Sequence, residues 1–419
     1  MQRLLLSLQS RPENLTAAPP APDTSSGSRS QTGLSVHLPI NALYVSGGPV
    51  EGEVELDFRQ LRQDNAQEVR VRLRGLARTF VTLDKTTLQE DVHLVRTSVA
   101  VWRSGDAYPP PGSDVLRFPF SFQLPPTLPP SLHYVGGGGV VDIKYAVTAV
   151  AVRPGTFHRN RRVRVPLAVV DRDSRAHIRD RLLGLAAGTD AIPWRTHRTQ
   201  ENVRKGLWGN YGTVQVQLTI PDIPVLPLFA PIPFIIEVKT TSPPLTRAKA
   251  DALPPGKPVF PPAPAEFTTL EFKLRRKLHI RANAYAVDSS SDVAVFTRDA
   301  SVISAAHADP IESAWSPLHG ADEKSADAPG TWVQRAAFRS SFRLTCAHTF
   351  KIDNADSEFH LDVKVPIPGV GNNVHVKVPV VLTSGVDAPV PLDGLRPHAP
   401  TAGRDHPATL TYRREFWDR

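Results

Sequence analysis

The sequence is poor in the features on which secreted and membrane-spanning proteins depend. Its 419 residues include a single cysteine, Cys346, so no disulfide can form within the chain. No apolar run is long enough to cross a bilayer as a helix. The leucines at 4–6 form a shorter run than the hydrophobic part of a typical secretory signal. These absences favour a reducing compartment, and we expect a cytoplasmic protein.

Signatures of catalysis and of cofactor binding are also missing. The glycine run 136–139 is not followed by the lysine of a phosphate-binding loop, and no Gly-x-Ser-x-Gly turn occurs. The fourteen histidines are scattered, and one cysteine cannot supply a thiolate cluster for zinc. The six tryptophans form no stripe for stacking nucleic-acid bases. We therefore expect no enzyme activity, no cofactor, no metal ion and no nucleic-acid partner.

Proline, in contrast, is abundant, with 41 residues against 26 glycines. Because proline removes a backbone donor and fixes φ, it favours turns, edge strands and linkers over helices. Between the turn clusters, apolar and polar side chains alternate, as in 50–58, where Glu51, Glu53 and Glu55 share one side. Similar short segments recur along the chain. This pattern predicts an all-β protein made of antiparallel, immunoglobulin-like β-sandwiches.

The length of the chain suits two such domains with tails. We expect a disordered N-terminal segment (1–33), a first β-sandwich (34–170), an interdomain connection (171–213), a second β-sandwich (214–385) and a Pro-rich tail (386–419). A short helix is expected near 177–185 in the connection. Two stretches of the second sandwich, 242–265 and 299–330, have the composition of long flexible insertions.

Four segments of the first domain resemble the N-terminal domain of the arrestin family. They are YVSGGPVEGEVEL at 44–56, VRVRLRG at 69–75, FPFSFQLP at 118–125 and IKYAVTA at 143–149. The chain is most similar to the fungal α-arrestins, the arrestin-related trafficking adaptors. The resemblance implies an arrestin fold, with an N-type and a C-type sandwich of the E-set class. It also implies an adaptor, recruited to the plasma membrane or endosomes, that links membrane-protein cargo to ubiquitin-dependent endocytosis.

One feature of that subgroup is missing from the printed sequence. Fungal α-arrestins recruit a HECT-type ubiquitin ligase through Pro-Pro-x-Tyr motifs, and none occurs here. Ligase recruitment is therefore an open question. The alternative is a structural scaffold of an endosomal sorting coat, similar to the arrestin-fold subunit of retromer, which needs no ligase.

Basic residues give the chain a net charge of +8 and a pI near 9.7. Several arginines alternate along strand-like segments that an immunoglobulin-type order would bring into one sheet, opposite the acidic strand 50–58. The candidate residues for binding anionic lipids or a phosphorylated cargo tail are Arg70, Arg72, Arg74, Lys144, Arg159, Arg161, Arg162 and Arg164. Ordinary solubilising arginines are the alternative interpretation.

Overall fold

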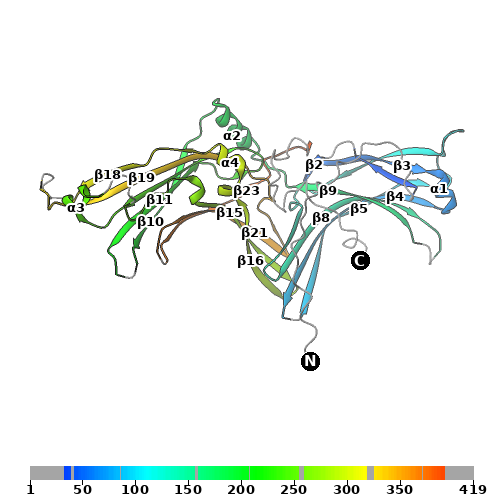
Figure 1. Ribbon diagram of the computed structural model, residues 1–419. Coiled ribbons are helices and arrows are strands. Elements are labelled where there is room, and N and C mark those ends of the chain that lie inside the picture. The colour runs from blue at the N-terminus through cyan, green and yellow to red at the C-terminus, as the bar shows by residue number, and fades with distance from the viewer. Residues whose placement is uncertain are drawn as a thin grey trace.

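The computed structural model describes residues 33–38, 42–84, 86–155, 159–206, 208–253, 259–318, 325–369 and 371–391. Most of them lie in β-strands, as the sequence predicts, and the fold is all-β. The structure is elongated, with two β-sandwiches placed end to end (Figure 1). The predicted N-terminal segment 1–33 and Pro-rich tail 386–419 lie almost entirely outside the described residues.

The first sandwich consists of a small sheet and a large sheet. Its elements are β1 (Leu34–His37), β2 (Ala42–Val45), β3 (Pro49–Asp57), α1 (Phe58–Gln63), β4 (Glu68–Leu83), β5 (Thr86–Arg103), β6 (Val115–Gln123), β7 (Leu132–Gly136), β8 (Gly139–Val152) and β9 (Arg161–Val170). The small sheet has the order β1-β3-β6. The large sheet has the order β2-β9-β8-β4-β5, with β7 paired to β8. The acidic strand β3 and the basic strands β4, β8 and β9 thus lie in opposite sheets, as predicted.

The second sandwich also has two main sheets. Its strands are β10 (Trp194–Arg204), β11 (Tyr211–Pro221), β12 (Leu226–Pro227), β13 (Ile232–Thr241), β14 (Leu245–Thr246), β15 (Glu271–Ala282), β16 (Tyr285–Val295), β17 (His307–Ala308), β18 (Glu312–Pro317), β19 (Pro329–Phe342), β20 (Lys351–Ile352), β21 (Ala355–Pro366), β22 (Asn373–Val380) and β23 (Leu382–Thr383). The last strand, β24 (Val390–Pro391), follows the second sandwich along the chain but pairs with β2 in the large sheet of the first. One sheet has the order β10-β11-β13-β19-β14, and the other has β16-β15-β21-β20 with β22 beside β21.

Helices are short and lie in the connections between strands. Besides α1, they are α2 (His177–Ala187), α3 (Arg247–Asp251), α4 (Ala300–Ser304), η1 (Phe267–Thr269) and η2 (Phe296–Arg298). The helix α2 confirms the prediction near 177–185, and its C-terminus is closed by Gly188 in the left-handed conformation.

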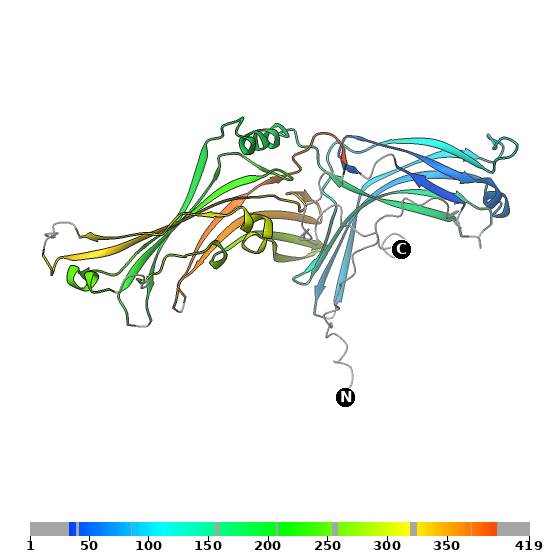
Figure 2. The same cartoon turned by 45° about the horizontal axis from the view of Figure 1, so that its top comes forward.

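Two hydrophobic cores hold the sandwiches together, and each extends across the boundary between them. The first core includes Val71 and Leu73 of β4, and also Leu278 and Ile280 from the second sandwich. The second core is rich in phenylalanine and also takes in Val170 at the end of β9. Figure 2 shows the β15–β16 hairpin reaching the first sandwich. Because apolar side chains cross the boundary in both directions, the sandwiches share a packed interface.

Three sequence expectations need correction. The connection 171–213 contains the strand β10, which pairs with β11 over its whole length. The insertion 299–330 contains α4, β17 and β18, and β18 forms a hairpin with β19. The insertion 242–265 contains β14 and α3. These elements escaped prediction because edge strands and surface helices need few apolar residues, so the apolar alternation is weak.

Candidate anion-binding face

Arginines cover the outer face of the large sheet in the first sandwich. On β4, Arg70, Arg72 and Arg74 point outward, since they alternate with the fully buried Val71 and Leu73. The cross-strand register places Arg96 of β5 directly opposite Arg74. On the other side, β8 separates β4 from β9, which contributes Arg162 and Arg164. The strands β4, β5, β8 and β9 lie side by side in Figure 1.

Four of these arginines have no carboxylate partner among the described residues. They form what we call the arginine strip: Arg72, Arg74, Arg96 and Arg162. Partial burial lowers the pKa of Arg72, and repulsion from Arg162, Arg70 and Arg96 lowers it further. Burial and repulsion from Arg72, Arg96 and Arg162 likewise lower the pKa of Arg74. The nearby Glu68 offsets only part of this repulsion at Arg72, so the strip is a site of concentrated positive charge that a bound anion would stabilise.

Other predicted residues lie on this face but are already partnered. Arg70 forms an ion pair with Glu68 at 2.7 Å, and the same carboxylate contacts Arg103. The side chain of Arg164 donates a hydrogen bond to the hydroxyl of Thr148 at 3.2 Å. These two arginines flank the strip and add to its positive electrostatic potential, but their partners Glu68 and Thr148 hold their side chains in place.

Lys144 does not belong to the exposed face, contrary to the sequence expectation. Its side chain is only 10% exposed, and its Nζ atom lies 3.0 Å from a carboxylate oxygen of Asp142. His133 contacts the same carboxylate. Burial alone would raise the pKa of Asp142, but the hydrogen bond from His133 and the charge of Lys144 lower it. Lys144 is thus part of a compensated polar cluster.

Arg161 is also displaced from the face on which it was expected. Neighbouring residues of a strand point to opposite sides, so Arg161 and Arg162 cannot share one face. Arg161 instead pairs with Asp64 at 2.9 Å, at the C-terminal end of α1, where Arg153 also reaches it. Both arginines lower the pKa of Asp64, against the effect of burial. Arg159 lies before β9, is exposed, and contributes its carbonyl oxygen to Arg153.

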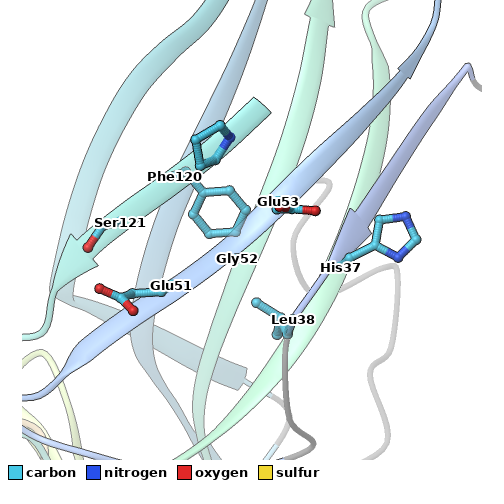
Figure 3. A pocket seen from close by; sticks show the side chains of 8 residues that line it. His37, Leu38, Glu51, Gly52, Glu53, Phe120 and Ser121 are labelled. Carbon is cyan, nitrogen blue, oxygen red and sulfur yellow. The ribbon is translucent and has the colours of Figure 1, made fainter. Parts of the chain in front are cut away.

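The opposite face of the first sandwich is acidic. Glu51 and Glu53 of β3 border a shallow hollow of about 610 Å³ beside Phe120 (Figure 3). Gly52 forms its floor, since a Cβ atom there would lie 2.6 Å from the carbonyl oxygen of His37 and 2.8 Å from the Phe120 ring. Arg117 neutralises part of this acidity by pairing with Glu55 at 2.9 Å. The first sandwich is therefore electrostatically two-sided.

A second candidate surface is formed where hairpins of the two sandwiches meet. The β4–β5 hairpin contacts the β15–β16 hairpin: Glu90 accepts hydrogen bonds from the Arg281 side chain at 3.2 Å and the Asn283 backbone at 2.6 Å. The β7–β8 hairpin joins them through Tyr134 and Ser289, whose hydroxyls are 2.5 Å apart. The tips expose apolar side chains, namely Leu83, Val135 and Tyr285. This surface cannot be predicted from the sequence, because it depends on contacts across the domain boundary.

At the junction of the two sandwiches, both ring nitrogens of the buried His348 have a hydrogen-bond partner. His348 lies between β19 and β20. Its Nε2 atom accepts a hydrogen bond from the backbone N–H of Asp171 at 3.0 Å. Its Nδ1 atom lies 2.8 Å from the Thr349 carbonyl oxygen. Burial lowers the pKa of His348 in spite of the nearby Asp171 and Asp173. A neutral imidazole therefore bridges the segment that leaves β9 and the second sandwich.

Among the described residues, no cluster of three or more His, Cys, Asp or Glu side chains is arranged to hold a metal ion. No helix in the described ranges is both long and apolar enough to cross a membrane. Cys346 is buried.

Comparison with known proteins identifies the first sandwich. Residues 39–172 match the family model of the arrestin (or S-antigen) N-terminal domain. No curated protein matches the chain. The matched segment covers β2 to β9, the strands that carry the arginine strip. Together with the all-β fold of two sandwiches, this match supports an arrestin-like family for the chain.

Proposed function

We propose that the protein is a non-enzymatic, arrestin-like adaptor that binds cytoplasmic segments of membrane-protein cargo through the arginine strip. The observation that supports this function is the accumulation of four arginines without carboxylate partners on one sheet face, where partial burial and, after it, mutual repulsion lower the pKa of Arg72 and Arg74. Guanidinium groups bind phosphate and carboxylate oxygens in pairs, so acidic or phosphorylated segments are the fitting ligands. Downstream, the adaptor links its cargo to ubiquitin-dependent endocytosis.

Charge reversal on the strip tests this function. The variant Arg72→Glu/Arg74→Glu should lose binding to membrane-protein extracts by about thirtyfold or more, at roughly 1 kcal/mol for each basic residue near an anionic partner. Phosphatase treatment of the extract should reduce binding of the unaltered protein. The matched control is Arg198→Glu/Arg335→Glu, which makes the same change in net charge at two exposed residues of the second sandwich.

Two results would contradict the proposal. Equal losses in both variants would indicate a nonspecific charge effect, and an unchanged Arg72→Glu/Arg74→Glu variant would exclude the strip. Anionic liposomes form a separate arm of the experiment. Salt-sensitive sedimentation with them, without binding to phosphorylated extracts, would favour lipid head groups as the ligand.

The scaffold of an endosomal sorting coat is the second candidate, favoured by the missing Pro-Pro-x-Tyr motif. Proximity labelling in cells separates the two functions. Labelled ubiquitin ligase and transporters would support the adaptor, whereas labelled coat subunits would support the scaffold.

A further inference from the structure

The strand β10 forms an open edge of the second sandwich. It pairs with β11 along its whole length, and no strand within the described ranges pairs with its other side. It contains neither proline nor glycine, and its register with β11 has no irregularity. Natural proteins usually cover or interrupt such an edge, because its backbone N–H and C=O groups are a template for another strand. The β10–β11 hairpin points away from the first sandwich (Figure 1), so this edge is separate from the arginine strip.

Two sets of hydrogen bonds show which backbone groups of β10 face the open side. Just before the strand, the carbonyl oxygen of Pro193 accepts a hydrogen bond from the backbone N–H of Asp222, which follows β11, at 2.7 Å. At the other end, the N–H and C=O groups of Arg204 both contact the side chain of Asn372 and are therefore not directed at β11. Backbone groups of successive residues point to opposite edges of a strand. The even-numbered residues of β10 thus present their N–H and C=O groups at the open edge, and Asn372 covers only the last of them.

A second copy of β10 fits this edge in one register with full overlap. In an antiparallel pair related by a two-fold axis, residues that face each other lie on the same side of the sheet. Because side chains alternate between the two sides, the axis must pass through a residue and not between two residues. An axis at Thr199, the middle of the 11-residue strand, gives every residue of β10 a partner in the other copy.

The same register brings opposite charges together. With the axis at Thr199, His197 of one copy lies directly opposite Glu201 of the other, and Arg195 is the diagonal neighbour of that carboxylate. Glu201 is exposed and has no ion-pair partner among the described residues of its own chain. Two-fold symmetry repeats each of these contacts, so the edge is complementary to itself.

Neighbouring registers lack this match. An axis at Arg198 would set two arginines face to face, and an axis at Gln200 would move Glu201 out of its place opposite His197. Either shift would also leave residues at the ends of β10 without a partner. The register with the longest overlap is therefore also the one with the best match of charge.

We propose that two copies of the protein associate through their β10 strands and form one continuous β-sheet across a two-fold axis at Thr199. Backbone hydrogen bonds from the even-numbered residues hold the two strands together, and the contact of Glu201 with His197 fixes their register. The occupant of this edge is a second copy of the chain. The association does not depend on what the arginine strip binds.

Cysteine crosslinking of the full chain tests the position of the axis. Odd-numbered residues form the non-hydrogen-bonded pairs, whose Cα atoms are about 4.5 Å apart, within the range that a disulfide can bridge. Under mild oxidation Thr199→Cys should therefore yield a covalent dimer of twice the 45.8 kDa of the chain. The matched control, Thr219→Cys, lies on β11 away from the edge and should not crosslink, and the native Cys346 is buried in both variants. Absence of the Thr199→Cys dimer, or equal crosslinking of the control, would overturn the proposal.

Charge substitutions test the register without a covalent bond. In sedimentation equilibrium, His197→Glu and Glu201→Arg should each raise the dimer dissociation constant by about tenfold or more, since each copy then opposes like charges twice. An equimolar mixture of the two variants should dimerise again, because the substituted positions of one variant then face opposite charge in the other. This recovery also shows that both variants are folded. A monomeric unaltered protein at every concentration, or a mixture that stays monomeric, would refute pairing through β10.

Discussion

Thr79 offers a sharp test of how firmly the two sandwiches are joined. Its side chain is fully buried at the interface, where its hydroxyl donates a hydrogen bond to the Arg281 carbonyl oxygen at 2.5 Å. The same hydroxyl accepts one from the side-chain amide of Asn354 at 3.2 Å. The substitution Thr79→Val keeps the shape and the β-propensity but removes both hydrogen bonds.

The expected loss of stability follows from the two buried groups that lose a hydrogen-bond partner, the Arg281 carbonyl oxygen and the Asn354 side-chain amide. A buried donor or acceptor without a partner costs about 1–3 kcal/mol, and Asn354 retains only its long 3.4 Å bond to the Ala77 carbonyl. We therefore expect Thr79→Val to lower the free energy of unfolding by about 2–4 kcal/mol. Urea unfolding at pH 7, followed by both tryptophan fluorescence and circular dichroism, measures this change. If the interface couples the sandwiches, the two signals should also separate along the urea axis in the variant.

Thr82→Val is the matched control. Thr82 lies on the same strand but is exposed, and its hydroxyl contacts only that of Thr87 at 3.1 Å. The control should change the free energy of unfolding by less than about 0.5 kcal/mol. If Thr79→Val costs no more than Thr82→Val, the polar contact at the domain boundary does not stabilise the protein and the reasoning is wrong.

Three further predictions concern stability. Because burial lowers the folded-state pKa of His348 below the 6.5 of the unfolded chain, stability should fall as the pH drops below about 6.5, and His348→Gln should reduce this pH dependence in urea unfolding between pH 7.5 and 5.5. Hydrogen bonds from Lys273 and Lys364 lower the pKa of Glu271 to about 2 from 4.5; its stabilisation should be present at pH 7 and be lost as the pH falls from 4.5 towards 2. Since the Glu271 side chain is 40% exposed, solvent screening limits the cost of Glu271→Gln at pH 7 to about 1 kcal/mol, and no loss at pH 7 would contradict the assignment. Gly75→Ala should cost about 1–3 kcal/mol in thermal unfolding, because the new Cβ would lie 2.6 Å from the buried Tyr145 ring; an unchanged melting temperature would show that the ring can move aside.

The alternation of apolar and polar residues along the strands was sufficient to predict much of this structure. Alternation along β3, β4 and β6 correctly separated inward from outward residues, and it correctly placed Arg70, Arg72 and Arg74 on one face. The same rule, applied strictly, also separates Arg161 from Arg162. Their shared basic character suggests one cluster, but the backbone geometry directs them to opposite sides of the sheet.

The pairing of the strands and their register could not be predicted from the sequence. Arg96 joins the strip only because β5 pairs with β4 in the register that places it opposite Arg74. The pairing of Lys144 with Asp142, in contrast, is predictable from the sequence, since Asp142 lies two residues earlier on the same face and can neutralise the lysine. The strand β10 lacked an apolar signal because it is an edge strand, with most of its side chains exposed. Such elements are held by backbone pairing, which leaves little trace in composition.

The short strand β24 has a practical consequence for dividing the protein into fragments. It runs antiparallel to β2, so a piece of chain from beyond the second sandwich completes the edge of the first. A fragment ending near residue 172 would leave that edge bare, and it would also lose Leu278 and Ile280 from its core. Uncapped β-strands and uncovered apolar surface both promote self-association. The first sandwich expressed alone should therefore aggregate, and co-expression with the remainder of the chain should keep it in solution.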